Sequence, residues 1–537
     1  MKRRNNRFLA GTLAGLMMLT MLPVTALAAE NGAADETTTA VDGAPVPGTS
    51  DNGIENVVND TGDSQDTGAN ADANDTGDTN PTAGNDGAGE NNTTGGENGT
   101  DESNPVGGEN GTGESNPTGG ETSAPVTPPA ETFAAKIGDV KYDSLSKAVE
   151  AAESGDTIEV GENITLDSGL AFAGVSELTI KGAENVNPTI TLNNFGMYLE
   201  NTNVTFQDIE IVVNAITNAS PEHTGSTANL INGSDFTLDN ASLTLNGPAN
   251  HTGGSGMYLY KKSNLYVTNG SKVEVSGFNG NRASGIFADD SDYKDMPNRE
   301  IQVTGRSSIV ITDCNWHGLT INPMNVTIDG YSEIDVSECG GNGGKGGIGC
   351  YYGTFTISDH SVLNVNDNEG RSWGIFANGL SIDSTSSMSA SRNASHGAVL
   401  AAKSTIAAGA KVTLSGNKRA GLRVYTGSNR WHGDVTIEDG ADFLSTGNLN
   451  GIEILPEGKL NMQGGTAEKN HSTTYGGGLY NRGGVAVIGG SAEIANNHAD
   501  TAGDDIYNTT YTDEDSGAVT EPSLTLAPTG DGWTLDD

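Results

Sequence analysis

Cysteine and basic residues are scarce in this chain of 537 residues. Cys314, Cys339 and Cys350 are its three cysteines, which excludes a scaffold built on disulfides and allows one bridge at most. Lysine and arginine number 27 against 70 acidic residues, which gives a net charge of −43. Such an excess of negative charge argues against nucleic acid and anionic membranes as partners.

Long apolar runs are also missing, apart from one near the N-terminus. Basic residues precede an apolar run at 8–22, and small residues follow it up to Ala29. This layout is typical of a secretory signal peptide, here residues 1–28, cleaved near Ala28 or Ala29. We expect no other segment to span a membrane, and a retained anchor is the alternative interpretation.

Residues 29–132 have the composition of a linker. They are rich in Gly, Asn, Thr, Asp, Glu and Pro, contain no lysine or arginine, and include the repeat GGENGTDESNPV (95–106) and GGENGTGESNPT (107–118). With so little apolar surface to offset the entropy of ordering, this segment is predicted to be disordered and extended by its like charges. It is either a spacer or a solubilising tail.

Folded structure is predicted to begin at residue 133. Residues 134–160 indicate a short strand, a helix capped by Ser144 and a second strand. Leu145, Ala148, Val149 and Ala152 share one face of that helix, as expected for a cap over the end of a repetitive β region.

A repeat of about 25 residues occupies the rest of the chain. Each unit contains three short strands and three turns, for example VTI (326–328), SEIDV (332–336) and then GIGC (347–350). Small residues precede the second strands, at intervals of 24 to 36 residues: Ala241, Ser271, Ser307, Ser332, Ser361, Ser386, Ala410, Ala441, Thr466 and Ser491. This pattern predicts an all-β fold, a right-handed parallel β-helix (solenoid) over 133–510, in which each unit is one coil. Residues 511–537 are expected to be a tail or the start of a further segment.

Alternating aliphatic residues in the second strands are predicted to form the core. Examples are Val273 with Val275, Ile334 with Val336, and Leu363 with Val365. Seven residues after four of the small residues the chain has an asparagine, at 368, 393, 417 and 448, and such stacked asparagines can bond from coil to coil.

The stretch CNWHGLTI (314–321) at first suggests a catalytic or metal site, but the same count places Cys314 and Cys339 in the position of the asparagines. In neighbouring coils they are close enough for a disulfide, and two stacked thiols are the alternative. Cys350 falls on the inward side of its strand and is predicted to be a buried thiol.

Residues 134–160 and the coils behind them resemble the pectate-lyase-like right-handed β-helix superfamily, and most of all its non-catalytic, adhesin-like branch. YGGGLYNRG (475–483) and GGSAEIANNHADTAGDDIYN (489–508) also resemble polymorphic outer-membrane protein repeats. The resemblance implies a secreted or surface-displayed protein of a Gram-positive bacterium that contacts carbohydrate or a host surface. It is specific for the fold, which hosts many functions.

Catalytic and metal-binding chemistry has few candidates. Asp289, Asp290, Asp292 and Asp295, in the loop of the longest coil, are a candidate Ca²⁺ site, with a solvated loop as the alternative. Asp504 and Asp505 resemble the paired carboxylates of glycoside hydrolases, but their place at the last coil favours a turn. The histidines show no His-x-x-x-His spacing, so we expect no zinc and no cofactor.

Binding residues are easier to place. The outward positions of the third strands include Phe287, Phe376, Arg423 and Tyr480, and the loop 425–434 adds Arg430, Trp431 and His432. Outward aromatic rings can stack on sugars. The leading hypothesis is therefore an adhesin that binds glycans or host glycoproteins without catalysis. The alternatives are a polysaccharide lyase or glycoside hydrolase acting on acidic polysaccharide, and a structural spacer.

Overall fold

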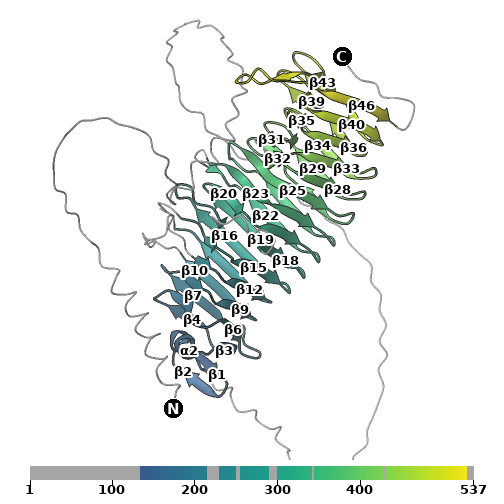
Figure 1. Ribbon diagram of the computed structural model, residues 1–537. Coiled ribbons are helices and arrows are strands. Elements are labelled where there is room, and N and C mark those ends of the chain that lie inside the picture. The colour runs from purple at the N-terminus through teal and green to yellow at the C-terminus, as the bar shows by residue number, and fades with distance from the viewer. Residues whose placement is uncertain are drawn as a thin grey trace, which may run out of the picture. The chain divides into compact units, whose positions relative to one another are not determined.

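The computed structural model describes residues 133–528, except 215–228, 249–253, 290–298, 342–343 and 428–429. The signal-peptide and linker predictions lie outside these residues. The described residues form an all-β parallel solenoid, as the sequence predicts (Figure 1). Each coil contributes one strand to each of three faces, which we number in the order in which the chain visits them.

The first face holds the strands that come first in each coil. Two long strands, β23 and β25, bend from the third face into this one, because the chain makes no turn between the two faces in those coils. Its strands are β3 (Asp156–Val160), β6 (Glu177–Gly182), β9 (Asn203–Gln207), β12 (Asp235–Asp239), β15 (Asn264–Thr268), β18 (Glu300–Val303), β21 (Asn325–Ile328), parts of β23 (Gly346–Ile357) and β25 (Trp373–Ile382), β28 (Lys403–Ile406), β33 (Asp434–Ile437), β36 (Lys459–Met462), β40 (Val485–Gly490) and β46 (Ser523–Pro528).

The second face is a separate 13-stranded sheet. Its strands are β4 (Ile164–Leu166), β7 (Thr189–Asn193), β10 (Glu210–Asn214), β13 (Ser242–Asn246), β16 (Lys272–Phe278), β19 (Ser308–Cys314), β22 (Glu333–Ser337), β24 (Val362–Asn366), β26 (Ser387–Ser389), β29 (Lys411–Ser415), β34 (Asp442–Thr446), β37 (Thr466–Glu468) and β41 (Glu493–Ala495).

The third face carries the residues that the sequence predicts to point outward. Its strands are β5 (Leu170–Ala173), β8 (Met197–Glu200), β11 (Asn229–Asn232), β14 (Met257–Tyr260), β17 (Ile286–Asp289), β20 (His317–Asn322), the other parts of β23 and β25, β27 (His396–Leu400), β30 (Leu422–Val424), β35 (Ile452–Ile454), β39 (Leu479–Arg482) and β43 (Ile506–Thr509).

The N-terminal end of the solenoid contains the predicted helix, α2 (Leu145–Ala151) (Figure 1). The Ser144 side chain accepts a hydrogen bond from the backbone N–H of Lys147, which satisfies one of the first donors of the helix. Leu145 and Ala148 are buried against the core. Strands β1 (Ala135–Ile137) and β2 (Val140–Tyr142) form an antiparallel hairpin before it, and β1 continues the pairing to β3.

The C-terminal end extends further than the sequence suggests. Strand β46 pairs in parallel with β40, so the solenoid sheet continues to Pro528 rather than ending at residue 510. A short antiparallel hairpin, β44 (Tyr511–Thr512) with β45 (Val519–Thr520), lies between the last third-face strand and β46.

The core consists of aliphatic rows that run from coil to coil. Val273, Ile309, Ile334 and Leu363 are successive members of one such row, and all are fully buried. The predicted inward positions of the second strands are therefore confirmed. Since each coil is too thin to bury its own apolar side chains, stability arises from the contacts between coils.

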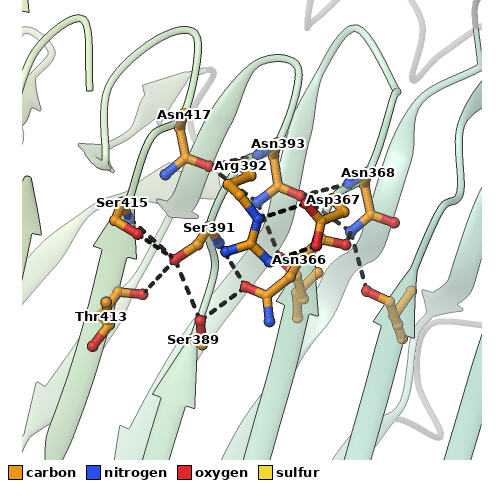
Figure 2. A network of polar contacts seen from close by, with 12 residues as sticks. Asn366, Asp367, Asn368, Ser389, Ser391, Arg392, Asn393, Thr413, Ser415 and Asn417 are labelled. Carbon is orange, nitrogen blue, oxygen red and sulfur yellow. Dashed lines mark hydrogen bonds and ion pairs between the residues drawn. The ribbon is translucent and has the colours of Figure 1, made fainter. Parts of the chain in front are cut away.

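An asparagine ladder runs along the turn between the second and third faces (Figure 2). Its members are buried, and each side-chain Nδ2 donates to the Oδ1 of the next member and to a backbone carbonyl of the previous coil. Each Oδ1 also accepts the backbone N–H of the preceding member. The ladder comprises Asn368, Asn393, Asn417, Asn448, Asn470 and Asn497.

Both ends of this ladder are closed by other residues. The backbone N–H of Cys339 donates to Asn368 at one end, at 3.1 Å. At the other end Asp505 Oδ1 accepts both the backbone N–H and the Nδ2 of Asn497, at 3.1 and 3.0 Å. Asp505 is completely buried, so the carboxylate that resembled half of a catalytic pair ends a structural ladder.

The glycines that begin the third strands make room for the ladder. A Cβ atom added at Gly397 would lie 2.7 Å from Asn417 Nδ2, and one at Gly421 would lie 2.7 Å from Asn448 Nδ2. The same conflict recurs at Gly451 with Asn470 and at Gly478 with Asn497. The paired occurrence of asparagine and glycine is therefore a packing requirement.

The seven-residue count does not predict two members of the ladder, Asn470 and Asn497. Strand β37 pairs Thr466 with Leu444, so Thr466 lies within the second strand rather than before it. The step from Asn448 to Asn470 is 22 residues, shorter than the repeat suggests. The count from Thr466 and from Ser491 therefore falls beyond Asn470 and Asn497.

Removing one ladder amide should destabilise the solenoid. Asn417→Ala would remove the donor to the carbonyl of Ala390 and the acceptor of the Asn393 backbone N–H. Each buried polar group left unpaired costs about 1–3 kcal/mol, so we expect a loss of about 3 kcal/mol or more in the free energy of unfolding. Urea titration followed by tryptophan fluorescence would measure it. Asn187→Ala, at an exposed position, is the control, and equal effects of the two substitutions would contradict a stabilising ladder.

Candidate ligand-binding face

A row of outward residues follows the third face from coil to coil. Strand pairing places them in one register, and the predicted positions from Phe287 to Tyr480 are all in it. We call this row the outer row: Tyr198, Leu230, Tyr258, Phe287, Thr320, Gly349, Phe376, Val399, Arg423, Glu453, Tyr480 and Tyr507. The sequence therefore predicts which side chains share this face, but the structure decides which of them reach solvent.

The middle of the outer row is covered by a hairpin. Strands β31 (Thr426–Gly427) and β32 (Trp431–His432) pair antiparallel, and Trp431 Nε1 donates to the carbonyl of Tyr351 at 3.3 Å. The Trp431 ring lies 5.6 Å from that of Phe376. These two side chains are only 3% and 1% exposed. The prediction that Phe376 and Trp431 stack on a ligand is therefore wrong, because they pack on each other.

Further aromatic rings complete this central aromatic cluster. The ring centroids of Trp373 and Tyr351 lie 5.0 and 5.5 Å from that of Phe376. Tyr425 contacts both Phe376 and Trp431. His317, the histidine of CNWHGLTI, stacks at 6.2 Å on Trp373 and hydrogen-bonds through Nε2 to the Tyr351 hydroxyl. The cluster anchors the hairpin to coils that are distant in sequence.

Arg423 belongs to a buried charged group beside this cluster. Its Nε lies 3.0 Å from Glu453 Oε2, and its Nη1 lies 3.2 Å from His396 Nε2. Arg482 Nη1 lies 3.3 Å from the other Glu453 oxygen. Burial and the charge of Arg423 lower the pKa of His396, so this histidine is neutral. Arg423 is thus a structural ion-pair partner rather than an exposed ligand contact.

A group of half-buried aromatic residues lies at the C-terminal end of this face. Tyr475 and Tyr507 stack with ring centroids 4.5 Å apart and an interplanar angle of 16°. Tyr480 lies 6.2 Å from Tyr475 and 5.8 Å from Tyr507. All three are half-buried. Arg482 lies over the ring of Tyr480 at 5.5 Å, and over that of Tyr511 at 5.8 Å. We call these four tyrosines and Arg482 the terminal tyrosine patch.

The other predicted binding residues lie apart from this patch. Phe287 is half-buried against Tyr258, with ring centroids 5.1 Å apart. Arg430 and His432 are exposed on the hairpin. Tyr480 is therefore the only predicted residue that the structure places in the terminal tyrosine patch. Tyr475, Tyr507 and Tyr511 were missed, although the GLYN and DIYN sequences of successive coils repeat a tyrosine in the same register.

The cysteines are free thiols, not a disulfide. Cys314 Sγ and Cys339 Sγ each donate to the carbonyl two residues earlier, at 3.4 and 3.2 Å. The contact with the Cys339 thiol and burial raise the pKa of Cys314. Cys350 is fully buried, which raises its pKa to about 12, so all three positions are structural.

The candidate Ca²⁺ loop is only partly described. Asp289 ends strand β17 and accepts a hydrogen bond from Asn322 Nδ2 at 3.4 Å. Asp290, Asp292 and Asp295 lie outside the described residues. Asp504, the partner of Asp505 in the proposed carboxylate pair, accepts the backbone N–H of Ala499 at 2.7 Å.

His317 should make stability depend on pH. Burial, with a smaller effect of the Lys345 charge, lowers its folded-state pKa to about 3. The unfolded state binds a proton below about pH 6.5 and the folded state does not, so stability is lost as pH falls through that value. Between pH 7.5 and pH 5 the contribution is about 2 kcal/mol.

Urea titrations at both pH values would test this. His317→Gln should reduce the loss of stability at pH 5, whereas His360→Gln, at an exposed site, should leave it unchanged. The same loss in His317→Gln and the unmodified protein would contradict a neutral buried histidine.

Comparisons with known proteins assign this chain to no family. No family model and no curated protein matches the chain. Among solved structures, the Siphovirus 9NA tailspike receptor binding domain is 10% identical, with a TM-score of 0.25, and the match covers 74% of this chain and 76% of that chain. So slight a likeness assigns no function. Among the described residues, no helix is long and apolar enough to cross a membrane.

Proposed function

We propose that this protein is a secreted or surface-displayed adhesin of a Gram-positive bacterium, and that it binds glycans or glycoproteins without catalysis. The terminal tyrosine patch is the observation that supports the proposal. It brings rings from two neighbouring coils together, with a guanidinium beside them.

Half-exposed tyrosines suit carbohydrate because a tyrosine side chain and a sugar ring each have an apolar face and polar hydroxyl groups. The C–H face of a sugar packs on an aromatic ring, while the phenolic hydroxyl offers a donor and an acceptor to sugar hydroxyls. A tyrosine hydroxyl keeps its proton at neutral pH, and partial burial raises the pKa of Tyr480 further. Tyr475, Tyr480 and Tyr507 contact one another. They therefore hold each other in place, so that less side-chain conformational entropy is lost when a ligand binds.

Arg482 adds a preference for acidic or strongly polar groups. Glu453 holds it at 3.3 Å, and the rings of Tyr480 and Tyr511 lie beneath it. Its planar guanidinium suits carboxylate and sulfate groups of a glycan. On a chain whose net charge is −43, such a fixed cation directs an anionic ligand to one end of the face.

The structural duties of the candidate carboxylates support binding over catalysis. Asp505 terminates the asparagine ladder, and Asp504 accepts a backbone N–H. Glu453 lies between two arginines. A glycosidase needs two carboxylates that face a shared substrate site, whereas these three are held in structural contacts.

Loss of one ring from the patch should weaken glycan binding. Aromatic contacts contribute about 0.5–1.5 kcal/mol each, so Tyr507→Ala or Tyr480→Ala should reduce affinity up to about tenfold. A glycan array identifies the ligand, and calorimetry then measures the affinity. Tyr331→Asn removes a tyrosine that is 56% exposed outside the patch, at a backbone φ of 62° that asparagine tolerates, and should have no effect. Unchanged affinity in both patch variants would place the binding site elsewhere.

The absence of catalysis has a separate test. Incubation with acidic polysaccharides should release neither unsaturated products nor reducing ends. Release that saturates with substrate would overturn the non-catalytic part of the proposal.

A further inference from the structure

Two histidines from neighbouring coils meet near the C-terminal end of the solenoid. Strand β38 (His471–Ser472) pairs in parallel with β42 (His498–Ala499), which places His471 opposite His498. Their ring centroids are 4.9 Å apart. They lie 27 residues apart in the sequence. The prediction of no zinc site considered only closely spaced histidines and therefore missed this pair.

Asp500 completes a set of three donor groups. Its Oδ1 lies 2.8 Å from His471 Nε2 and 3.4 Å from His498 Nε2. All three donor atoms lie within 4.8 Å of one another. Around a tetrahedral zinc ion with bonds of about 2.0–2.2 Å, donor atoms lie roughly 3.3–3.5 Å apart. The three donors therefore need little movement to surround an ion, and the site is exposed to solvent.

A second carboxylate orients one of the imidazoles. His498 Nδ1 lies 3.2 Å from Asp504 Oδ1, and that oxygen also accepts the backbone N–H of Ala499 at 2.7 Å. The contact favours a proton on Nδ1 and leaves the Nε2 lone pair on the side of Asp500. A carboxylate that fixes the histidine tautomer in this way is a recurrent outer partner of metal-binding histidines.

The backbone beneath this group is held in place. Asp505, next to Asp504, is completely buried at the end of the asparagine ladder. Asn470 and Asn497 immediately precede the two histidines and are consecutive members of that ladder. The distance between the two imidazoles is thus set by the spacing of two locked coils.

We propose that His471, His498 and Asp500 bind a divalent transition-metal ion, Zn²⁺ in particular, with Asp504 as the positioning residue for His498. Two imidazoles and one carboxylate match the donor types of zinc sites with three protein ligands, whose fourth position holds water or another group. Nitrogen donors select zinc over Ca²⁺ and Mg²⁺, which prefer oxygen. The ion links two neighbouring coils, so it stabilises the C-terminal end of the solenoid by mass action.

The proposal is tested by treating the full, tag-free chain with EDTA to remove bound metal and then titrating it with zinc. Calorimetry should show one Zn²⁺ per chain, no comparable binding of Ca²⁺ or Mg²⁺, and a rise in the thermal midpoint with zinc. His471→Ala and His498→Ala should abolish both effects. Asp504→Asn should weaken zinc binding by about 10–100-fold, as expected for an outer partner.

His360→Ala is the matched control. His360 is exposed and pairs with Asp359 at 3.1 Å, but its partner ring is Tyr331 rather than a second histidine. Zinc binding should be unchanged in this variant. One equivalent of zinc retained in a His471→Ala/His498→Ala double variant, or no binding to the unmodified chain, would overturn the proposal.

Discussion

The pairing of buried polar groups between coils is the constraint on which this solenoid depends. Where a coil turns between two faces, backbone groups are left that strand pairing does not satisfy. Serine hydroxyls solve this at one turn, where Ser307 and Ser332 each accept the backbone N–H of the equivalent residue in the previous coil. Asparagine amides solve it at the next. Coils can therefore vary in length and loop content as long as these two turns keep their register.

Much of the fold follows from the sequence because strand alternation and turn chemistry act locally. Val273, Ile334 and Leu363 are buried where the alternation predicts. Four ladder asparagines were predicted from a fixed count, whereas Asn470 was missed because its coil is shortened to a 22-residue step. The residue seven positions before Asn470 is Gln463, so a count that starts from small residues does not reach this asparagine.

The binding face shows the limit of such inference. Periodicity determines the direction of a side chain, and the outer row is correct from Phe287 to Tyr480. Exposure depends on what covers that side chain, and Trp431 reaches a carbonyl 80 residues earlier in the chain. The histidine pair is a similar case, since His471 and His498 meet only because two coils stack in register. Their shared position after a ladder asparagine was the available signal.

The direction of the asparagine ladder has a consequence for how such a chain can evolve. The bonds between asparagine side chains all run one way, from each Nδ2 to the Oδ1 of the next coil. Each interior coil therefore offers the same acceptor to the coil before it and the same donors to the coil after it. Whole interior coils are interchangeable units that duplication or deletion can add or remove. The coil that ends at Asp505 is different, since Asp505 accepts from Asn497 where the other coils have an asparagine amide, and the ladder ends there. Coils can therefore be added or removed along the ladder upstream of Asp505 while the contacts at its end stay the same.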